Sequence, residues 1–297
     1  MGGVMFCSDA DLSGDSVIFL AHQWNFFPGK QYTPSDFNEK KVTGGTFLTL
    51  GSFGNFSLGN TSEASNGTAT YRLTLSLPNT ARTYSLYLPE IFSAYTLYLN
   101  EEKVCSQGNP DPAHYQDLIG NKEISFTASG TVHITIIVTN YSHIYSGITY
   151  PPAFGTVTAI QKYLSTRLFI SGITLAAIFL FSVCSLFFFC RLKHKNALIF
   201  TILCGLFFVI SLYPVLFSYG SYSVFPWYPL EIACLTAMYP CMVLLQGTIL
   251  NLPKKLIRHE TLIFGSCVVL SLVFTLFLHD STHFAKIYSE FLFLYKA

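Results

Sequence analysis

Charged side chains are scarce in this chain: 11% of its 297 residues are Asp, Glu, Lys or Arg, and the formal net charge is +1. A nearly neutral chain without a basic stripe lacks the electrostatic footprint of nucleic-acid-binding proteins, so we expect no nucleic-acid partner. Hydrophobic residues make up 51% of the chain and aromatic residues 16%. This composition is too apolar for an ordinary soluble domain.

Motifs that would indicate an enzyme are absent. The sequence has no G-x-S-x-G nucleophile motif, no H-E-x-x-H zinc motif and no carboxylate pair typical of a hydrolase. Gly51, Gly54 and Gly59 precede no helix start that would supply phosphate-binding amides. His279 and His283 have the spacing of a helical metal pair, but they lack a third strong ligand. We therefore expect no catalytic residue, no metal and no cofactor in this chain.

Cysteine motifs are missing as well, because none of the eight cysteines forms a C-x-x-C pair. Six of them lie in the apolar C-terminal half, where they are expected to behave as small hydrophobic residues. Cys7 and Cys105 precede that half, and the sequence leaves open whether they form a disulfide.

A recognisable signal peptide is absent from residues 1–16, which have no basic segment followed by an apolar core. We expect these residues to be a disordered or truncated N-terminus. At the other end, residues 284–297 begin a further apolar segment that stops before it could cross a membrane. The sequence therefore predicts a truncated fifth span there.

Four long apolar segments occupy residues 168–190, 197–218, 225–250 and 261–278. The first has no charged residue and as a helix would extend ~34 Å, enough to cross a hydrocarbon core of about 30 Å. Within lipid, each backbone amide must be satisfied inside its own segment, which favours a helix. The sequence predicts an all-α polytopic transmembrane domain with the lipid bilayer as its partner.

Basic residues are concentrated in the first and third connections between these spans. They are Arg191, Lys193 and Lys195, then Lys254, Lys255 and Arg258. The second connection, residues 219–224, has no charge. Because Lys and Arg are retained on the cytoplasmic side, the residues before Leu168 are expected to lie outside the plasma membrane of the cell.

Residues 17–160 show a different period, in which apolar and polar side chains alternate. In residues 69–77, Tyr71, Leu73 and Leu75 alternate with Arg72 and Thr74. The same period returns in three later segments, which are residues 84–88, 94–100 and 131–139. Short alternating segments separated by polar turns predict an all-β jelly roll or β-sandwich as an extracellular domain.

Seven segments carry a family resemblance when they are taken in order. They are HQWNFFPG at 22–29, YTPSDF at 32–37, TYRL at 70–73, LPEIFSAY at 88–95, TNYSH at 139–143, RLKHKNAL at 191–198 and WYPLE at 227–231. Over nearly the whole chain they resemble the bacterial seven-transmembrane receptors with diverse intracellular signalling modules, or DISM receptors. The resemblance implies a galactose-binding-like jelly-roll head and a cytoplasmic output domain such as a histidine kinase or cyclase. This chain differs in ending early in its fifth span, so the output domain is expected to be missing from it.

Five residues of the head are candidates for ligand binding. Asn140 and His143 follow a predicted strand and place polar groups in a loop, although Asn140 is equally suited to hold the turn itself. Trp24, Tyr98 and Asn100 suit a carbohydrate platform of aromatic rings with a polar rim. The structural alternatives are that Trp24 belongs to the core and that Asn100 forms a hairpin turn.

Three residues of the spans are candidates for transmembrane signalling. Glu231 is the one acid inside a span, where an acid commonly marks function, although a position near the outer end also allows a hydrated carboxylate. Pro214 and Pro240 remove amide donors and can kink their helices, which membrane proteins also tolerate without a functional role.

These patterns predict a membrane sensory receptor whose head binds an extracellular small molecule, with a carbohydrate as the expected class. A transporter or channel subunit is the main alternative, but the spans offer few polar groups for a pathway. The sequence also leaves open a protein-interaction or dimerisation module, and with it a homodimer. A surface glycosidase would require a catalytic carboxylate pair that the chain does not show.

Overall fold

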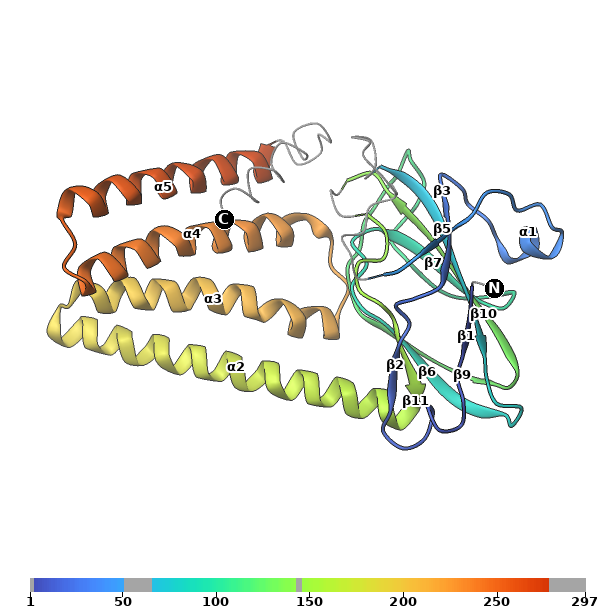
Figure 1. The fold of residues 1–297 in the computed structure, drawn as a ribbon. Helices are drawn as coiled ribbons and strands as arrows, with labels where there is room; N and C mark the ends of the chain where they lie inside the picture. The colour runs from blue at the N-terminus through green and yellow to red at the C-terminus, as the bar shows by residue number, and fades with distance from the viewer. Residues whose placement is uncertain (1–2, 51–65, 143–145, 278–297) are drawn as a thin grey trace. The chain divides into compact units, whose positions relative to one another are not determined.

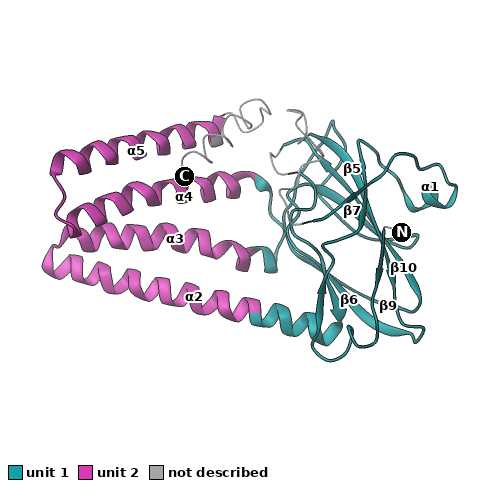
Figure 2. Ribbon diagram, viewed as in Figure 1, with its two compact units in different colours: residues 1–166, 217–224 teal, residues 167–216, 225–297 magenta. Residues whose placement is uncertain are grey.

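The computed structural model describes residues 3–50, 66–142 and 146–277. It divides the chain into two compact units, which Figure 2 colours separately. We call Met1–Thr166 with Phe217–Val224 the head unit, and Arg167–Leu216 with Phe225–Ala297 the helical unit.

The head unit contains two β-sheets and one short helix, α1 (Pro34–Asn38) (Figure 1). Sheet A has the order β4-β3-β5-β10-β7-β8, and β1 pairs with β5 beside this path. Its strands are β1 (Val4–Phe6), β3 (Trp24–Pro28), β4 (Thr46–Leu48), β5 (Gly67–Ser76), β7 (Ala94–Leu99), β8 (Glu102–Gln107) and β10 (Thr131–Asn140). Sheet B has the order β2-β11-β6-β9, with β2 (Val17–Phe19), β6 (Arg82–Leu88), β9 (Lys122–Ala128) and β11 (Ala153–Thr156). The predicted β-sandwich is confirmed.

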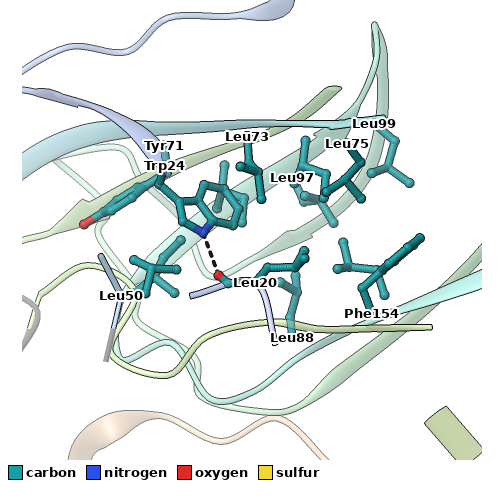
Figure 3. Close-up of a cluster of buried hydrophobic side chains, with 14 of the residues drawn as sticks. Leu20, Trp24, Leu50, Tyr71, Leu73, Leu75, Leu88, Leu97, Leu99 and Phe154 are labelled. Carbon is teal, nitrogen blue, oxygen red and sulfur yellow. Dashed lines mark hydrogen bonds between the residues drawn. The ribbon is translucent and has the colours of Figure 1, made fainter. Parts of the chain in front are cut away.

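The core of the head unit lies between the inner faces of the two sheets. Alternate residues of β5 and β10 face inward, and they meet Leu86, Leu88 and Phe154 of sheet B in one buried cluster. Burying each large aliphatic side chain contributes roughly 1.5–3 kcal/mol. Trp24 is fully buried in this cluster, and its indole N–H donates to the Leu20 carbonyl at 2.7 Å (Figure 3).

Residues 1–16 were expected to be a disordered or truncated N-terminus, and the described part of them, residues 3–16, contains a paired strand and buried side chains. Strand β1 pairs in parallel with β5, where Val4 lies opposite Thr74. Strand β3 pairs with β5 only as far as Arg72. The edge of β5 beyond Arg72 is therefore open to pairing with β1. Cys7 and Leu12 are buried in the core, and in this structure Cys7 and Cys105 are free thiols.

Four helices of the described chain are long and apolar enough to cross a membrane, which marks the chain as a membrane protein. They are α2 (Val157–Leu192), α3 (Lys195–Tyr219), α4 (Val224–Ile249) and α5 (Lys254–Phe277). The predicted fifth segment, residues 284–297, lies outside the described residues.

Helix α2 begins much earlier than the predicted start of the first span at Leu168. It follows β11 directly, and the Thr156 hydroxyl accepts the Ala159 N–H at 3.2 Å, which satisfies one amide of its first turn. Ile160 is buried against Tyr87 of sheet B, and Tyr163 packs edge-on against the same ring at 6.3 Å. The first ten residues of α2 therefore belong to the head unit.

Candidate functional site at Asp117

The connection between α3 and α4 forms part of the head unit, as Figure 2 shows by its colour. Ile119 and Tyr222 exchange two backbone hydrogen bonds, of 2.6 and 2.8 Å. The Asn121 N–H donates to the Phe217 carbonyl at 2.9 Å. Residues 217–222 thus run as a short antiparallel partner of residues 119–121.

Glycine at position 120 permits this close approach. A Cβ atom at Gly120 would lie 2.7 Å from the carbonyl oxygen of Gly220 and 2.7 Å from the Ser221 hydroxyl. Both distances are shorter than atoms tolerate, and one of the two neighbours is backbone that cannot rotate away. A residue without a side chain is therefore required where the two segments meet.

The carboxylate of Asp117 joins three segments of the head unit. Its Oδ1 accepts the Ser223 hydroxyl at 3.0 Å and the Val224 N–H at 3.3 Å, and its Oδ2 accepts the Ser142 hydroxyl at 2.5 Å. Asp117 is 8% exposed, so these donors replace most of its water. Val224 is the first residue of α4, so the carboxylate lies beside the start of this element.

Neighbouring side chains fix the loop that carries Asp117. The Tyr115 hydroxyl donates to the Thr139 carbonyl at 3.2 Å and lies 3.5 Å from the Asn140 side-chain oxygen. Burial raises the pKa of Tyr115 to about 12, and the charge of Asp117 contributes, so this phenol remains a neutral donor. Gln107 donates to the Leu118 carbonyl at 3.1 Å. Hydrogen bonds at Tyr115 and Leu118 therefore fix the chain on either side of Asp117.

This arrangement connects segments of the head unit that are distant in the sequence. The donors around the Asp117 carboxylate are two hydroxyls and one backbone amide, which hold the side chain between three segments. Among the described residues, no group of three or more His, Cys, Asp or Glu is placed to hold a metal ion. The site therefore suits a structural link whose strength depends on one buried charge.

Asn140, a predicted ligand residue, lies at the edge of this site. It is the last residue of β10, is fully buried and contacts Tyr115. Two residues further on, Ser142 donates to Asp117. Ser142 and the connection between α3 and α4 therefore share Asp117 as a hydrogen-bond partner, whereas His143 lies outside the described residues.

The other predicted ligand residues of the head lie away from Asn140. Trp24 is a core residue without exposed surface. Tyr98 faces Thr135 on β10, five residues before Asn140 and therefore about 17 Å along the strand. Asn100 lies in the turn between β7 and β8 with φ 54°, and its side chain accepts the His133 N–H at 2.9 Å. Trp24, Tyr98 and Asn100 therefore do not form a carbohydrate platform together with Asn140 in this structure.

The three predicted signalling residues lie in the helical unit. Pro214 is inside α3 and Pro240 inside α4, and both helices continue past them. The residue with non-helical dihedrals inside α4 is Phe225, with φ −88° and ψ 132°. Glu231 is partly buried in α4. Their role in signalling stays a prediction.

Asp117, Gly120 and Ser223 were not predicted as site residues. Ser223 carried one usable signal, because a serine directly before a long helix is a common N-cap. Asp117 carried none, since an aspartate in a loop with prolines is ordinary turn chemistry.

No family model and no curated protein matches the chain. Among solved structures, a β-glucuronidase from Faecalibacterium prausnitzii is 14% identical with a TM-score of 0.36, covering 46% of this chain and 31% of that one. A β-glucuronidase from an uncultured Clostridium is 16% identical with a TM-score of 0.35, over 47% of this chain and 28% of that one. A glycosyl hydrolase family 2 β-galacturonidase from Eisenbergiella tayi is 13% identical with a TM-score of 0.33, over 48% and 24%. The chain spans less than a third of these enzymes, and similarity this low carries no argument about activity.

Proposed function

We propose that this chain is the sensory part of a membrane receptor. Its head unit would bind an extracellular small molecule, and its helices would carry the resulting change across the bilayer. A carbohydrate is the ligand class implied by the resemblance to DISM receptors. The same resemblance implies a kinase or cyclase as the output.

The proposal rests on the hydrogen bonds between the sheet part of the head unit and the connection between α3 and α4. Asp117 binds Ser223 and Val224, and Ile119 pairs with Tyr222. Helix α2 also begins inside the head unit as a continuation of β11. A change in the head unit would therefore act on the start of α2, the end of α3 and the start of α4.

Ligand binding would shift this system only if the ligand had different affinities for two states of the receptor. A tenfold difference in affinity corresponds to about 1.4 kcal/mol, which is comparable to one charge-assisted hydrogen bond. The bonds of Asp117 have the right magnitude to be made in one state and broken in the other. We place the head unit outside the cell, because Lys193, Lys195 and Lys254 occupy the connections at the other helix ends.

The test uses the full chain in lipid nanodiscs and a panel of neutral, amino and acidic monosaccharides. Binding is measured by calorimetry, and amide hydrogen exchange of residues 217–224 is followed by mass spectrometry. We expect at least one sugar to bind and to alter exchange at Tyr222 and Val224. Absence of binding across the panel, or binding that leaves exchange there unchanged, would contradict the proposal.

A further inference from the structure

Basic residues lie at one end of the helical unit, in and beside the connections that link α2 to α3 and α4 to α5. Consecutive helices that each cross a membrane alternate in direction, so these two connections lie on the same side of it. We call the six residues the basic end, and all of them are exposed: Arg191, Lys193, Lys195, Lys254, Lys255 and Arg258. The connection on the other side, residues 219–224, has no charged residue. The connections therefore concentrate positive charge at one membrane surface.

The basic end lacks counter-charge from the protein itself. Glu260 is the one acid within residues 186–200 and 245–265, and its carboxylate lies 3.8 Å from the imidazole of His259. Among the described residues, none of the six cations forms an ion pair with an acid. Like charges this close in the sequence repel one another, so an external anion would stabilise this end of the helical unit.

The backbone keeps the cations at the helix ends. Only residues 193–194 separate α2 from α3, and only residues 250–253 separate α4 from α5. The Lys193 N–H donates to the Phe189 carbonyl at 2.9 Å, which closes the last turn of α2. In the other connection, the Leu252 N–H donates to the Gly247 carbonyl at 3.0 Å. Connections this short and this well bonded hold their charges at the membrane surface.

Helix stability does not account for the positions of the lysines. Lys195 is the first residue of α3, and Lys254 and Lys255 are the first two residues of α5. The first turn of a helix carries a partial positive charge, which repels cations. Retention of Lys and Arg in the cytoplasm explains the side on which these residues lie. It does not remove the repulsion, which only nearby negative charge can offset.

Exposed apolar side chains adjoin the cations. Leu192 is 59% exposed and Leu256 is 45% exposed. The guanidinium carbon of Arg191 lies 5.6 Å from the centre of the Phe187 ring, which is itself exposed. Long basic side chains extend along apolar surface and place their charge in the polar layer. This combination fits the boundary between acyl chains and headgroups better than it fits a soluble acidic partner.

We propose that the basic end binds anionic phospholipids of the leaflet that it faces. The Lys ammonium groups and Arg guanidinium groups donate hydrogen bonds to phosphate oxygens, and the net negative charge of the lipid supplies the missing counter-charge. A zwitterionic lipid carries a cationic group beside its phosphate, so it neutralises this surface less well. The proposal goes beyond the receptor function and does not depend on it, because it rests on the helical unit alone.

The test compares spin-labelled phosphatidylglycerol with spin-labelled phosphatidylcholine around the full chain in phosphatidylcholine bilayers. Electron spin resonance measures the fraction of each lipid that the protein immobilises. A lipid in contact with one cation should be favoured about fivefold, and lipids of the opposite leaflet dilute the measured preference to about threefold. Equal association of the two lipids at low salt would overturn the proposal and leave the cations to a different anionic partner.

Salt gives a second measurement on the unaltered chain. Charges act over about 30 Å in about 0.01 M salt and over about 3 Å in about 1 M salt. We expect the preference for phosphatidylglycerol to fall towards equality between these two conditions. A preference that is independent of salt would show that charge is not its cause, and it would refute the proposal.

Two triple substitutions locate the lipid contact. One combines Arg191→Gln, Lys193→Gln and Lys195→Gln, and the other combines Lys254→Gln, Lys255→Gln and Arg258→Gln. Each should move the preference roughly halfway to equality, because each removes half of the basic end. The matched control removes the same charge from exposed positions of the head unit, by replacing Lys30, Lys40 and Lys103 with Gln. An equal loss of preference in the control would show that net charge, and not the basic end, selects the lipid.

Charge-conserving variants keep the test decisive if a triple variant fails to insert. Lys254→Arg with Lys255→Arg retains both charges and should retain the preference for phosphatidylglycerol. Loss of the preference in this variant would contradict an interaction that depends on charge.

Discussion

The backbone N–H of Val224 donates to Oδ1 of Asp117, 107 positions earlier in the chain, over 3.3 Å. This single bond joins the first residue of α4 to a loop of the head unit. The other oxygen of the same carboxylate accepts Ser142, which follows β10. The carboxylate of Asp117 therefore connects the segment after β10 to the first residue of α4.

Replacing Asp117 with Asn should loosen the connection between α3 and α4. The amide keeps the shape of the side chain but removes the charge and one acceptor, so the bonds to Ser142, Ser223 and Val224 weaken by roughly 1.5–3 kcal/mol in total. We expect amide exchange at residues 217–224 to accelerate by about tenfold or more. Asp111→Asn is the control, since Asp111 lies in the same loop but accepts only Ala113 and His114. Equal acceleration in both variants would show that Asp117 has no special role.

Replacing Gly120 with Ala should disrupt the same connection by sterics alone. The new Cβ would lie 2.7 Å from the Gly220 carbonyl oxygen, and separating the segments breaks the pairing of Ile119 with Tyr222. We expect a cost of about 1–3 kcal/mol, measured as faster exchange of the Tyr222 amide. Gly172→Ala offers a comparison, because a Cβ there meets nothing within 4 Å. An unchanged Tyr222 amide in the Gly120 variant would argue against the close packing.

The elements that the sequence predicted are those with a repeating pattern. Alternation over residues 69–77 matches β5, and the four long apolar segments match α2 to α5. Strand β1 was missed because three residues cannot display a period. The start of α2 was missed because Gln161, Lys162 and Arg167 make its first part polar, and helix formation there depends on packing against sheet B.

The candidate site was less predictable because its contacts join distant positions. Ser142 is 25 positions from Asp117, and Val224 is 107 positions from it. No local spacing indicates such pairs. The sequence pointed to Asn140 and its loop as a ligand site, because polar residues after a strand have a local signature, and that role stays a prediction. In the structure Ser142, two residues further on, donates to Asp117.

Cys7 should resist alkylation in the folded protein. Burial, with a contribution from the charge of Asp11, raises the pKa of the Cys7 thiol to about 11, so little thiolate exists at pH 8. We expect N-ethylmaleimide to label Cys105, which is partly exposed, well before Cys7, as read by peptide mass spectrometry. Denaturant without reductant should then expose both thiols. If neither cysteine is labelled after unfolding, the two form a disulfide and the free-thiol state is wrong.

Trp24→Phe should destabilise the head unit without affecting ligand binding. The indole N–H donates to the Leu20 carbonyl inside the core, and phenylalanine leaves that carbonyl unpaired and a void beside it. The loss of bond and volume should cost about 2–4 kcal/mol in the free energy of unfolding, measured by denaturant titration. Tyr98→Phe, on the outer face, should have a much smaller effect on stability. Altered sugar affinity with unchanged stability in the Trp24 variant would restore Trp24 as a ligand residue.

His133 should make the head unit less stable in mild acid. Burial and the neighbouring charge of Arg72 lower the pKa of His133 below its ordinary value of 6.5 in the folded state. As the pH falls, the unfolded chain therefore takes up the proton before the folded protein does. The free energy of unfolding is highest above the unfolded-state pKa of His133, and it decreases as the pH drops from that value towards the folded-state pKa. His133→Gln should remove this dependence, seen as a smaller fall in thermal midpoint between pH 7.5 and 5.5, about one unit either side of the unperturbed value.

The Arg72→Met variant tests the cause of this acid sensitivity. Without the nearby cation, the pKa of His133 should rise towards its ordinary value, although burial still holds it down, and the acid sensitivity should shrink but persist. His114→Gln is the control, since the His114 side chain is 78% exposed beside Asp111. If the His114→Gln variant lost the pH dependence of stability and the His133→Gln variant kept it, His133 would not be the cause of that dependence.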